Sequence, residues 1–146
     1  MLHNALERIL EAQAVWADPL GKVFVAIFAA LYKPVPAIKD LLNGVWLGHP
    51  LHPAITDVPI GAYVVALVLD LSGQRAAATA AIGVGIVFML LAALAGYADY
   101  IDLEGKTQRF GTIHSSLMLV ALVLYLVSFV MRLSPLPSSA EVWLWT

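Results

Sequence analysis

The sequence predicts an all-α fold class, a polytopic membrane helical bundle, and three observations support it. Hydrophobic residues make up 61% of the 146-residue chain. Charged residues make up only 12%, about half of the ~25% found in soluble domains. Three apolar runs are also long enough to cross a bilayer. A soluble core of this size cannot bury so much apolar surface, so lipid must cover the remainder.

An interfacial helical lead-in is expected over residues 1–48. Residues 4–17 place apolar side chains at helical spacing, with charges on much of the other face, which is typical of an amphipathic helix. The apolar stretch 20–32 has 13 residues, fewer than the ~20 needed to cross. We therefore expect it to lie in the interface or to be re-entrant.

Three membrane spans are expected over residues 54–71, 76–98 and 111–133, within a membrane domain covering 49–133. The second span is rich in alanine and glycine spaced four residues apart, which lets helix backbones approach closely. The tail 134–146 ends in Trp-Leu-Trp-Thr and is interpreted as the possible start of a fourth span.

Lysine and arginine predict the orientation, because cytoplasmic loops carry an excess of them. The lead-in and the loop between the second and third spans share one side and hold six positive residues. The opposite side holds Arg75 and Arg132. The N-terminus is therefore expected in the cytoplasm. A crossing by residues 20–32 would split the N-terminal charges and weaken this expectation.

Three histidines are expected to meet at the cytoplasmic membrane face. His49 and His52 stand in the motif GHPLHP, directly before the first span, and His114 lies about one turn inside the third. Ionisable groups at such positions are costly and indicate a site. Neutral imidazole is the commonest metal ligand and the usual axial ligand of haem. The prolines after His49 and His52 favour extended backbone at both, so their rings are expected to point apart.

Carboxylates and an arginine are expected beside these imidazoles. Asp57 follows in the first span, and Asp99, Asp102 and Arg109 border the loop between the second and third spans. Such groups can orient the N–H groups of histidine ligands. Haem propionates would face Lys106 and Arg109. The alternative interpretation is a structural polar lid, in which these residues bind one another or solvent.

Other chemistries find little support in the sequence. The chain has no cysteine, which excludes disulfides, thiolate metal sites and a cysteine nucleophile. It has no phosphate loop, GxSxG or HExxH motif. The net charge of −2 indicates no nucleic-acid partner. No enzymatic activity is assigned.

Three blocks of the chain resemble the bacterial membrane proteins of domain-of-unknown-function family 2231. They are GHPLHPAITDVPIGAYVVALVLDL, AGYADYIDLEG and RFGTIHSSLMLVAL, and they fall within residues 44–132. The resemblance implies the bacterial inner membrane, and usually a fourth span. Some members of this family look fused to, or accompanied by, a Rieske iron–sulfur domain. This chain has no cysteine for such a domain, but the analogy implies electron transfer through a membrane haem.

We therefore expect a redox-type membrane subunit that holds haem b. His114 would be one axial ligand, because it lies on a regular helix, and His49 or His52 the other. A redox partner such as an iron–sulfur protein, or a homo- or hetero-oligomer, would accompany it. Two alternatives stay open. One is a non-haem metal or proton-handling site using His49, His52 and His114. The other is a non-catalytic anchor or assembly partner with a structural polar lid.

Overall fold

The structure, a computed structural model, describes residues 2–133 of the chain and, among the side chains, those from Glu7 onward. All regular elements in this range are helices, which confirms the all-α fold class. They are α1 (Leu2–Ala12), α2 (Ala14–Tyr32), α3 (Pro36–Leu42), α4 (Leu51–Leu71), α5 (Arg75–Tyr100) and α6 (Gly105–Leu133). The tail expected to begin a fourth span, 134–146, lies outside the described residues.

The three expected spans correspond to α4, α5 and α6, and each helix is longer than expected. α5 continues to Tyr100 and α6 already begins at Gly105, so the loop between them is shorter than the expected 99–110. These helices are long and apolar enough to cross a membrane. The chain is therefore an integral membrane protein whose outer surface contacts lipid.

α2 differs from the expected short helix over residues 20–32. It begins at Ala14 and continues through Pro19, which gives it 19 residues. By length and composition it is therefore a fourth candidate span. A proline inside a helix removes one backbone hydrogen bond. Here Asp18 and Gly21, on either side of Pro19, are both packed against α6, and these contacts hold the helix together.

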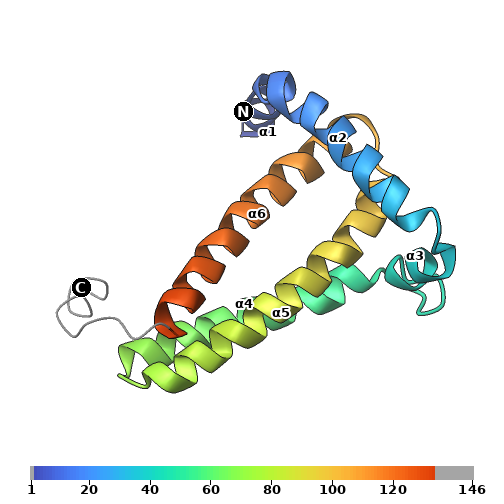
Figure 1. Cartoon of the computed structure of the whole chain (residues 1–146). Coiled ribbons are helices and arrows are strands. Elements are labelled where there is room, and N and C mark those ends of the chain that lie inside the picture. The colour runs from blue at the N-terminus through green and yellow to red at the C-terminus, as the bar shows by residue number, and fades with distance from the viewer. Residues whose placement is uncertain (1, 134–146) are drawn as a thin grey trace.

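The termini of α4, α5 and α6 lie at two opposite ends of the molecule. On one side, which we call the histidine end, α6 begins beside α2, α4 begins beside α3, and α5 ends between them, whereas the opposite termini lie together at the far end (Figure 1). α3 lies at the histidine end, and α2 crosses over α6 and α5 there (Figure 1). α4 and α5 pack against one another along their length.

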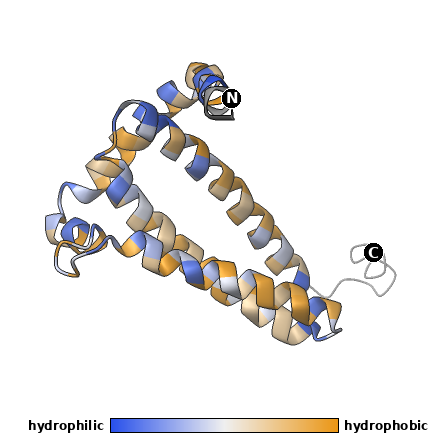
Figure 2. Cartoon of the chain, turned by 180° about the vertical axis from the view of Figure 1, so that it is seen from behind, coloured by the Kyte–Doolittle hydropathy of each residue, from blue (hydrophilic) through white to orange (hydrophobic). Residues whose placement is uncertain are grey.

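Two separate buried clusters hold these ends together. At the histidine end Tyr32, Tyr97, Ala98 and Tyr100 pack with aromatic residues of α2. At the far end a second cluster joins α4, α5 and α6 through Ala66, Ile82, Ile86 and Leu122. Much of α6 lies between the two clusters. Its residues 117–120 are 40–61% exposed, and the ribbon there is mostly apolar (Figure 2). Such a surface suits lipid as its solvent.

Candidate functional site

The polar residues of the histidine end bind one another across separate helices. Lys39 of α3 forms an ion pair with Asp102, with 2.6 Å between Nζ and Oδ2. The side-chain amide nitrogen of Asn43 donates to the Ala98 carbonyl at 3.1 Å and to Asp99 Oδ1 at 3.2 Å, and the amide oxygen accepts from Lys39 Nζ at 3.0 Å. Asp99 and Asp102 thus attach α3 to the end of α5. The polar-lid interpretation expects such contacts, in which these carboxylates bind neighbouring polar residues.

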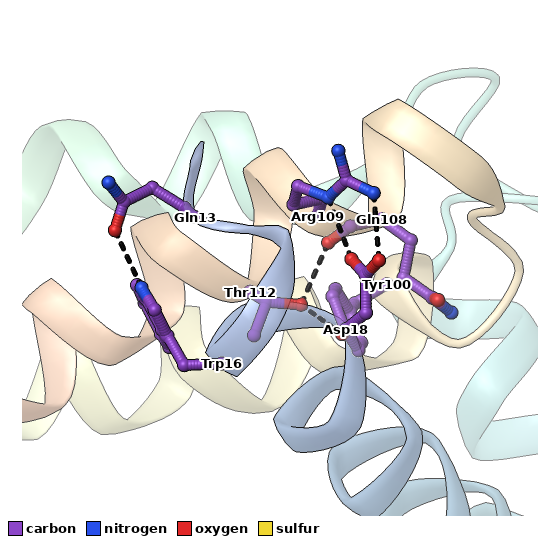
Figure 3. A network of polar contacts seen from close by, with 7 residues as sticks. All are labelled: Gln13, Trp16, Asp18, Tyr100, Gln108, Arg109 and Thr112. Atoms are coloured by element: carbon purple, nitrogen blue, oxygen red, sulfur yellow. Dashed lines mark hydrogen bonds and ion pairs between the residues drawn. The ribbon is translucent and has the colours of Figure 1, made fainter. Parts of the chain in front are cut away.

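Arg109 holds α2 against α6. Its guanidinium donates two hydrogen bonds of 2.7 Å to the carboxylate of Asp18 (Figure 3). One turn further along α6, the buried Thr112 hydroxyl lies 2.7 Å from the Tyr100 hydroxyl and donates to the Gln108 carbonyl. The structure therefore places Arg109 beside α2, where its charge is already neutralised.

Asp18, the partner of Arg109, was not identified by the sequence analysis. It is the only carboxylate in the apolar run of α2. An ionised group in such a run needs a partner of opposite charge. The sequence could therefore have predicted that Asp18 pairs with a basic residue of another helix. Lys106 is engaged as well, since its ammonium lies 3.2 Å from Glu7 and 3.7 Å from Glu11 of the N-terminal helices. The two cations expected near haem propionates thus bind α1 and α2.

His52 lies inside the bundle, although extended backbone was expected for it. α4 begins at Leu51, so His52 and Pro53 are in its first turn, where proline is tolerated because that N–H has no helical partner. Nδ1 of His52 lies 2.8 Å from the Ala92 carbonyl of α5. The ring sits directly against Gly96, where a Cβ would come within 2.9 Å of it. Among the described residues, nothing hydrogen-bonds to its Nε2.

His49 stands apart from the other two histidines. It precedes α4, is exposed, and its Nδ1 lies 3.2 Å from the carbonyl of the next residue, Pro50. The turn before it depends on Gly44, which has a φ of +74°. A Cβ at Gly44 would lie 1.6 Å from the His49 carbonyl oxygen. His49 and His52 therefore have different partners, the one in its own chain neighbour and the other in α5.

Asp57 is also remote from the imidazoles. It is exposed in the second turn of α4, on the side of the helix away from α5. Within the described residues no hydrogen bond or ion pair involves its carboxylate. The carbonyl of Ala92, and not Asp57, therefore orients the His52 ring.

His114 belongs to a register between α4 and α6, which run in the same direction. At the far end Arg132 donates to both oxygens of Asp70, at 2.9 and 2.5 Å. Closer to the middle, the rings of Tyr63 and Tyr125 stack with centroids 3.6 Å apart. In both pairs the two residues are 62 positions apart in the sequence. His52 and His114 have the same separation.

The spacing along each helix makes these three pairs equivalent. From the histidine to the tyrosine is 11 residues, and from the tyrosine to the charged residue is seven, in α4 and α6 alike. At 3.6 residues per turn these steps are close to three and two whole turns, so the three side chains share one helix face. We call Asp70–Arg132, Tyr63–Tyr125 and His52–His114 the register pairs.

The first two register pairs are in contact, whereas His52 and His114 form no hydrogen bond with each other. No Cα atom of α4 comes within 8 Å of one in α6, so long side chains alone bridge the two helices. His52 and His114 thus extend from well-separated backbones.

The cluster does not assemble a three-ligand metal site. Within the described residues, no group of three or more histidine, cysteine, aspartate or glutamate side chains is placed to hold a metal ion. His52 and His114 are each of a residue type that can serve as an axial haem ligand.

Comparison with known proteins places the chain in a family without adding a function. No curated protein and no solved structure gave a match. The model of a family described as predicted membrane protein (DUF2231) matches residues 48–143. This range contains all three register pairs and the helices that carry them. The chain therefore belongs to the DUF2231 family of predicted membrane proteins.

Proposed function

We propose that this protein is a membrane subunit of an electron-transfer system and holds haem b between His52 and His114. The observation that carries the proposal is the third register pair. Two pairs in this register are in contact, and the third pair has the same spacing and side chains that can ligate iron. A bound haem would supply reversible one-electron transfer at this place.

The surroundings of His52 favour its use as a ligand. Metal-ligating histidines usually hydrogen-bond through their other ring nitrogen to a carbonyl or carboxylate, which fixes the ring and its tautomer. The Ala92 carbonyl makes this contact with Nδ1 at 2.8 Å. Nε2 is then the nitrogen that would bind iron. Gly96 leaves the room that the ring needs.

The residues along the two helices would keep water away from the site. Met118 and Leu117 of α6 follow His114, and Pro59 and Tyr63 of α4 follow His52. Lys106 and Arg109 are paired with carboxylates of α1 and α2. The propionates would therefore be stabilised by solvent at the histidine end, or by cations released from those pairs.

An absorbance spectrum tests the proposal. Protein expressed with haem supplied and purified in detergent is expected to show a Soret band. His52→Ala and His114→Ala should each remove most of it, because each deletes one axial ligand. His49→Ala is the matched control and should keep it, since His49 is exposed and bonded to its own chain neighbour. The absence of a Soret band, or a band unchanged in the His52→Ala/His114→Ala double variant, would refute the proposal.

A second candidate function is that of a non-catalytic anchor or assembly partner. The observation that favours it is the mutual satisfaction of the polar lid, in which Lys39, Asn43, Asp99 and Asp102 bind one another. Copurification of a stoichiometric partner protein by haem-free protein would support this function. Loss of that partner in Lys39→Ala should follow, because the lid would open.

A non-haem metal or proton-handling site built from His49, His52 and His114 is the least supported of the three. Its ligands are not gathered in the described part of the chain. Elemental analysis of the purified protein decides the point. A stoichiometric metal other than haem iron that is lost in His52→Ala would support it.

A further inference from the structure

Helix α3 and the turn after it expose large apolar side chains at the histidine end. Val45, Trp46 and Leu47 of the turn are 64%, 66% and 48% exposed, and Ile38 and Leu41 of α3 are 51% and 38% exposed. We call these five residues the α3 patch. An exposed apolar patch of this kind marks a contact with a membrane or with another protein.

Backbone hydrogen bonds fix the turn that carries three of these residues. The N–H groups of Leu47 and Gly48 donate to the Gly44 carbonyl at 3.0 and 2.8 Å, and the Val45 N–H donates to the Asp40 carbonyl at 2.9 Å. Gly44 and Gly48 have φ values of +74° and +79°, a region that glycine enters without a steric cost. The chain is therefore shaped to hold these apolar side chains outward.

The polar side chains of α3 and its C-cap point the other way, toward the protein. Lys39 pairs with Asp102 at 2.6 Å, and Asn43 donates to the end of α5. In a water-soluble protein the apolar stripe of a surface helix packs on the core and the polar side faces water. Apart from Leu42, which packs with the buried cluster, and the exposed Asp40, α3 shows the opposite arrangement. We therefore expect its outer surroundings to be apolar.

The helices that hold α3 determine its level in the membrane. α5 has 26 residues, which makes it about 39 Å long at 1.5 Å per residue. The hydrocarbon core of a bilayer is about 30 Å thick, and the bilayer is about 40–45 Å thick with both headgroup layers. The ends of α5 therefore lie among the headgroups. Lys39 and Asn43 attach α3 to one of these ends, and the chain enters α4 soon after the patch, at Leu51 (Figure 1).

We propose that the α3 patch inserts into the headgroup layer and anchors the histidine end to the lipid surface. Tryptophan is enriched at this level of a membrane, and Trp46 is the most exposed residue of the patch. The exposed Asp40 argues against a deeper position, because a carboxylate is costly in the hydrocarbon core. α3 precedes α4 whether or not α2 crosses the membrane, and no histidine takes part in these contacts. The inference therefore depends neither on the topology of α2 nor on haem binding.

The fluorescence of Trp46 measures the depth of the patch. Trp46 becomes the single tryptophan of the chain once the other three are replaced, by Trp16→Phe, Trp143→Phe and Trp145→Phe. In phosphatidylcholine vesicles that contain the purified protein alone, its emission should lie at a shorter wavelength than that of indole in water. Lipids brominated near the headgroup should quench it more than lipids brominated near the ends of the acyl chains, because bromine quenches only at close range.

Two outcomes of this measurement would overturn the proposal. The first is an emission that stays water-like in these vesicles and is quenched by acrylamide but by neither brominated lipid. The second is an emission that shifts only in membranes isolated from cells, which would assign the patch to a partner protein.

Cysteine reactivity provides a second measurement, and the natural chain has no cysteine to interfere. In opened vesicles, Val45→Cys should react several-fold more slowly with a charged maleimide than Glu104→Cys, the matched control in the loop between α5 and α6. Both positions are exposed within one copy of the chain, so the protein alone produces no such difference. In denaturant the two rates should become equal. Equal rates in the vesicles would show that lipid does not cover the patch.

Discussion

Single glycines decide where the larger side chains of this bundle can lie. A Cβ at Gly85 would stand 2.4 Å from the ring of Tyr63, and one at Gly96 would stand 2.9 Å from the ring of His52. Both glycines are on α5, and both partners are on α4. The small-residue spacing of the second span was interpreted only as helix packing. These glycines also leave the space that the rings of Tyr63 and His52 occupy, and each ring belongs to a register pair.

Gly96→Ala should therefore displace His52. The added methyl would overlap the imidazole and break its contact with the Ala92 carbonyl. We expect a loss of stability of about 1–3 kcal/mol, as for other overpacked sites, and less haem per protein if haem is bound. Thermal unfolding in detergent and the Soret absorbance per protein measure the two effects. Gly61→Ala is the control, since its methyl meets no atom, and an equal effect of both variants would contradict this account.

Asp18 should matter more to stability than the other N-terminal carboxylates. Arg109 is only 17% exposed and has both of its hydrogen bonds to Asp18. Lys106 is 64% exposed and lies between Glu7 and Glu11, a kind of surface pair that contributes little. Asp18→Ala should therefore lower the unfolding temperature clearly more than Lys106→Ala does. Equal unfolding temperatures would show that the Asp18–Arg109 pair does not hold α2 in place.

At the scale of elements, the α4–α6 register is maintained at its far end by a charge pair. Arg132 is only 4% exposed and is bonded to Asp70. Asp70→Ala should destabilise the fold by about 1.5–3 kcal/mol, because it removes both hydrogen bonds that the Arg132 guanidinium donates to a carboxylate. The exchanged double variant Asp70→Arg/Arg132→Asp should recover part of this loss. Recovery stays incomplete because Arg75 also acts electrostatically on position 70. Chemical unfolding of the variants in micelles provides the measurement.

The register itself is testable without any cofactor. Thr56 and Met118 have the same 62-residue separation as the register pairs and lie one turn inside the histidines. A double variant with cysteine at both positions should be bridged by a short bis-maleimide. Direct disulfide formation should fail, because the Cα atoms are more than 8 Å apart. Thr56→Cys combined with Val120→Cys is the off-register control. Preferential bridging of that control would show that the register is wrong.

At the scale of the whole molecule, the path of α2 decides the topology. It is long enough to cross a membrane. However, Asp18 contacts the start of α6, and Tyr32 donates to the Leu94 carbonyl near the end of α5. Both ends of α2 thus contact residues near the histidine end, and the interfacial position of residues 20–32 stays a prediction. If α2 does not cross, the positive-inside rule predicts that the histidine end lies in the cytoplasm.

Cysteine accessibility in cells checks this topology. Glu11→Cys, Lys33→Cys and Glu104→Cys should all be protected from a membrane-impermeant maleimide added outside. Gln74→Cys, in the turn at the far end, should be labelled. Labelling of only one of Glu11→Cys and Lys33→Cys would show that α2 crosses the bilayer, and the orientation would then need revision.

The sequence by itself determined the membrane class and three of the four helices that are long and apolar enough to cross a bilayer. Hydrophobic composition and span length can be read from local sequence alone, without knowing which helices touch. The side of the membrane on which each loop is expected follows from the number of spans before it. Composition could also single out His52 and His114, because polar residues are rare and costly in such segments.

Only the tertiary structure decided which partner each polar residue has. Arg109 binds Asp18, Lys39 binds Asp102, and the Ala92 carbonyl orients His52. These contacts join residues 40 to 91 positions apart, and they depend on the angle and rotation of packed helices. A one-residue rotation of a helix changes its facing side chains but not its composition. For the same reason the spacing of the three register pairs was present in the sequence, but it became meaningful only once α4 and α6 were known to contact each other through Tyr63–Tyr125 and Asp70–Arg132.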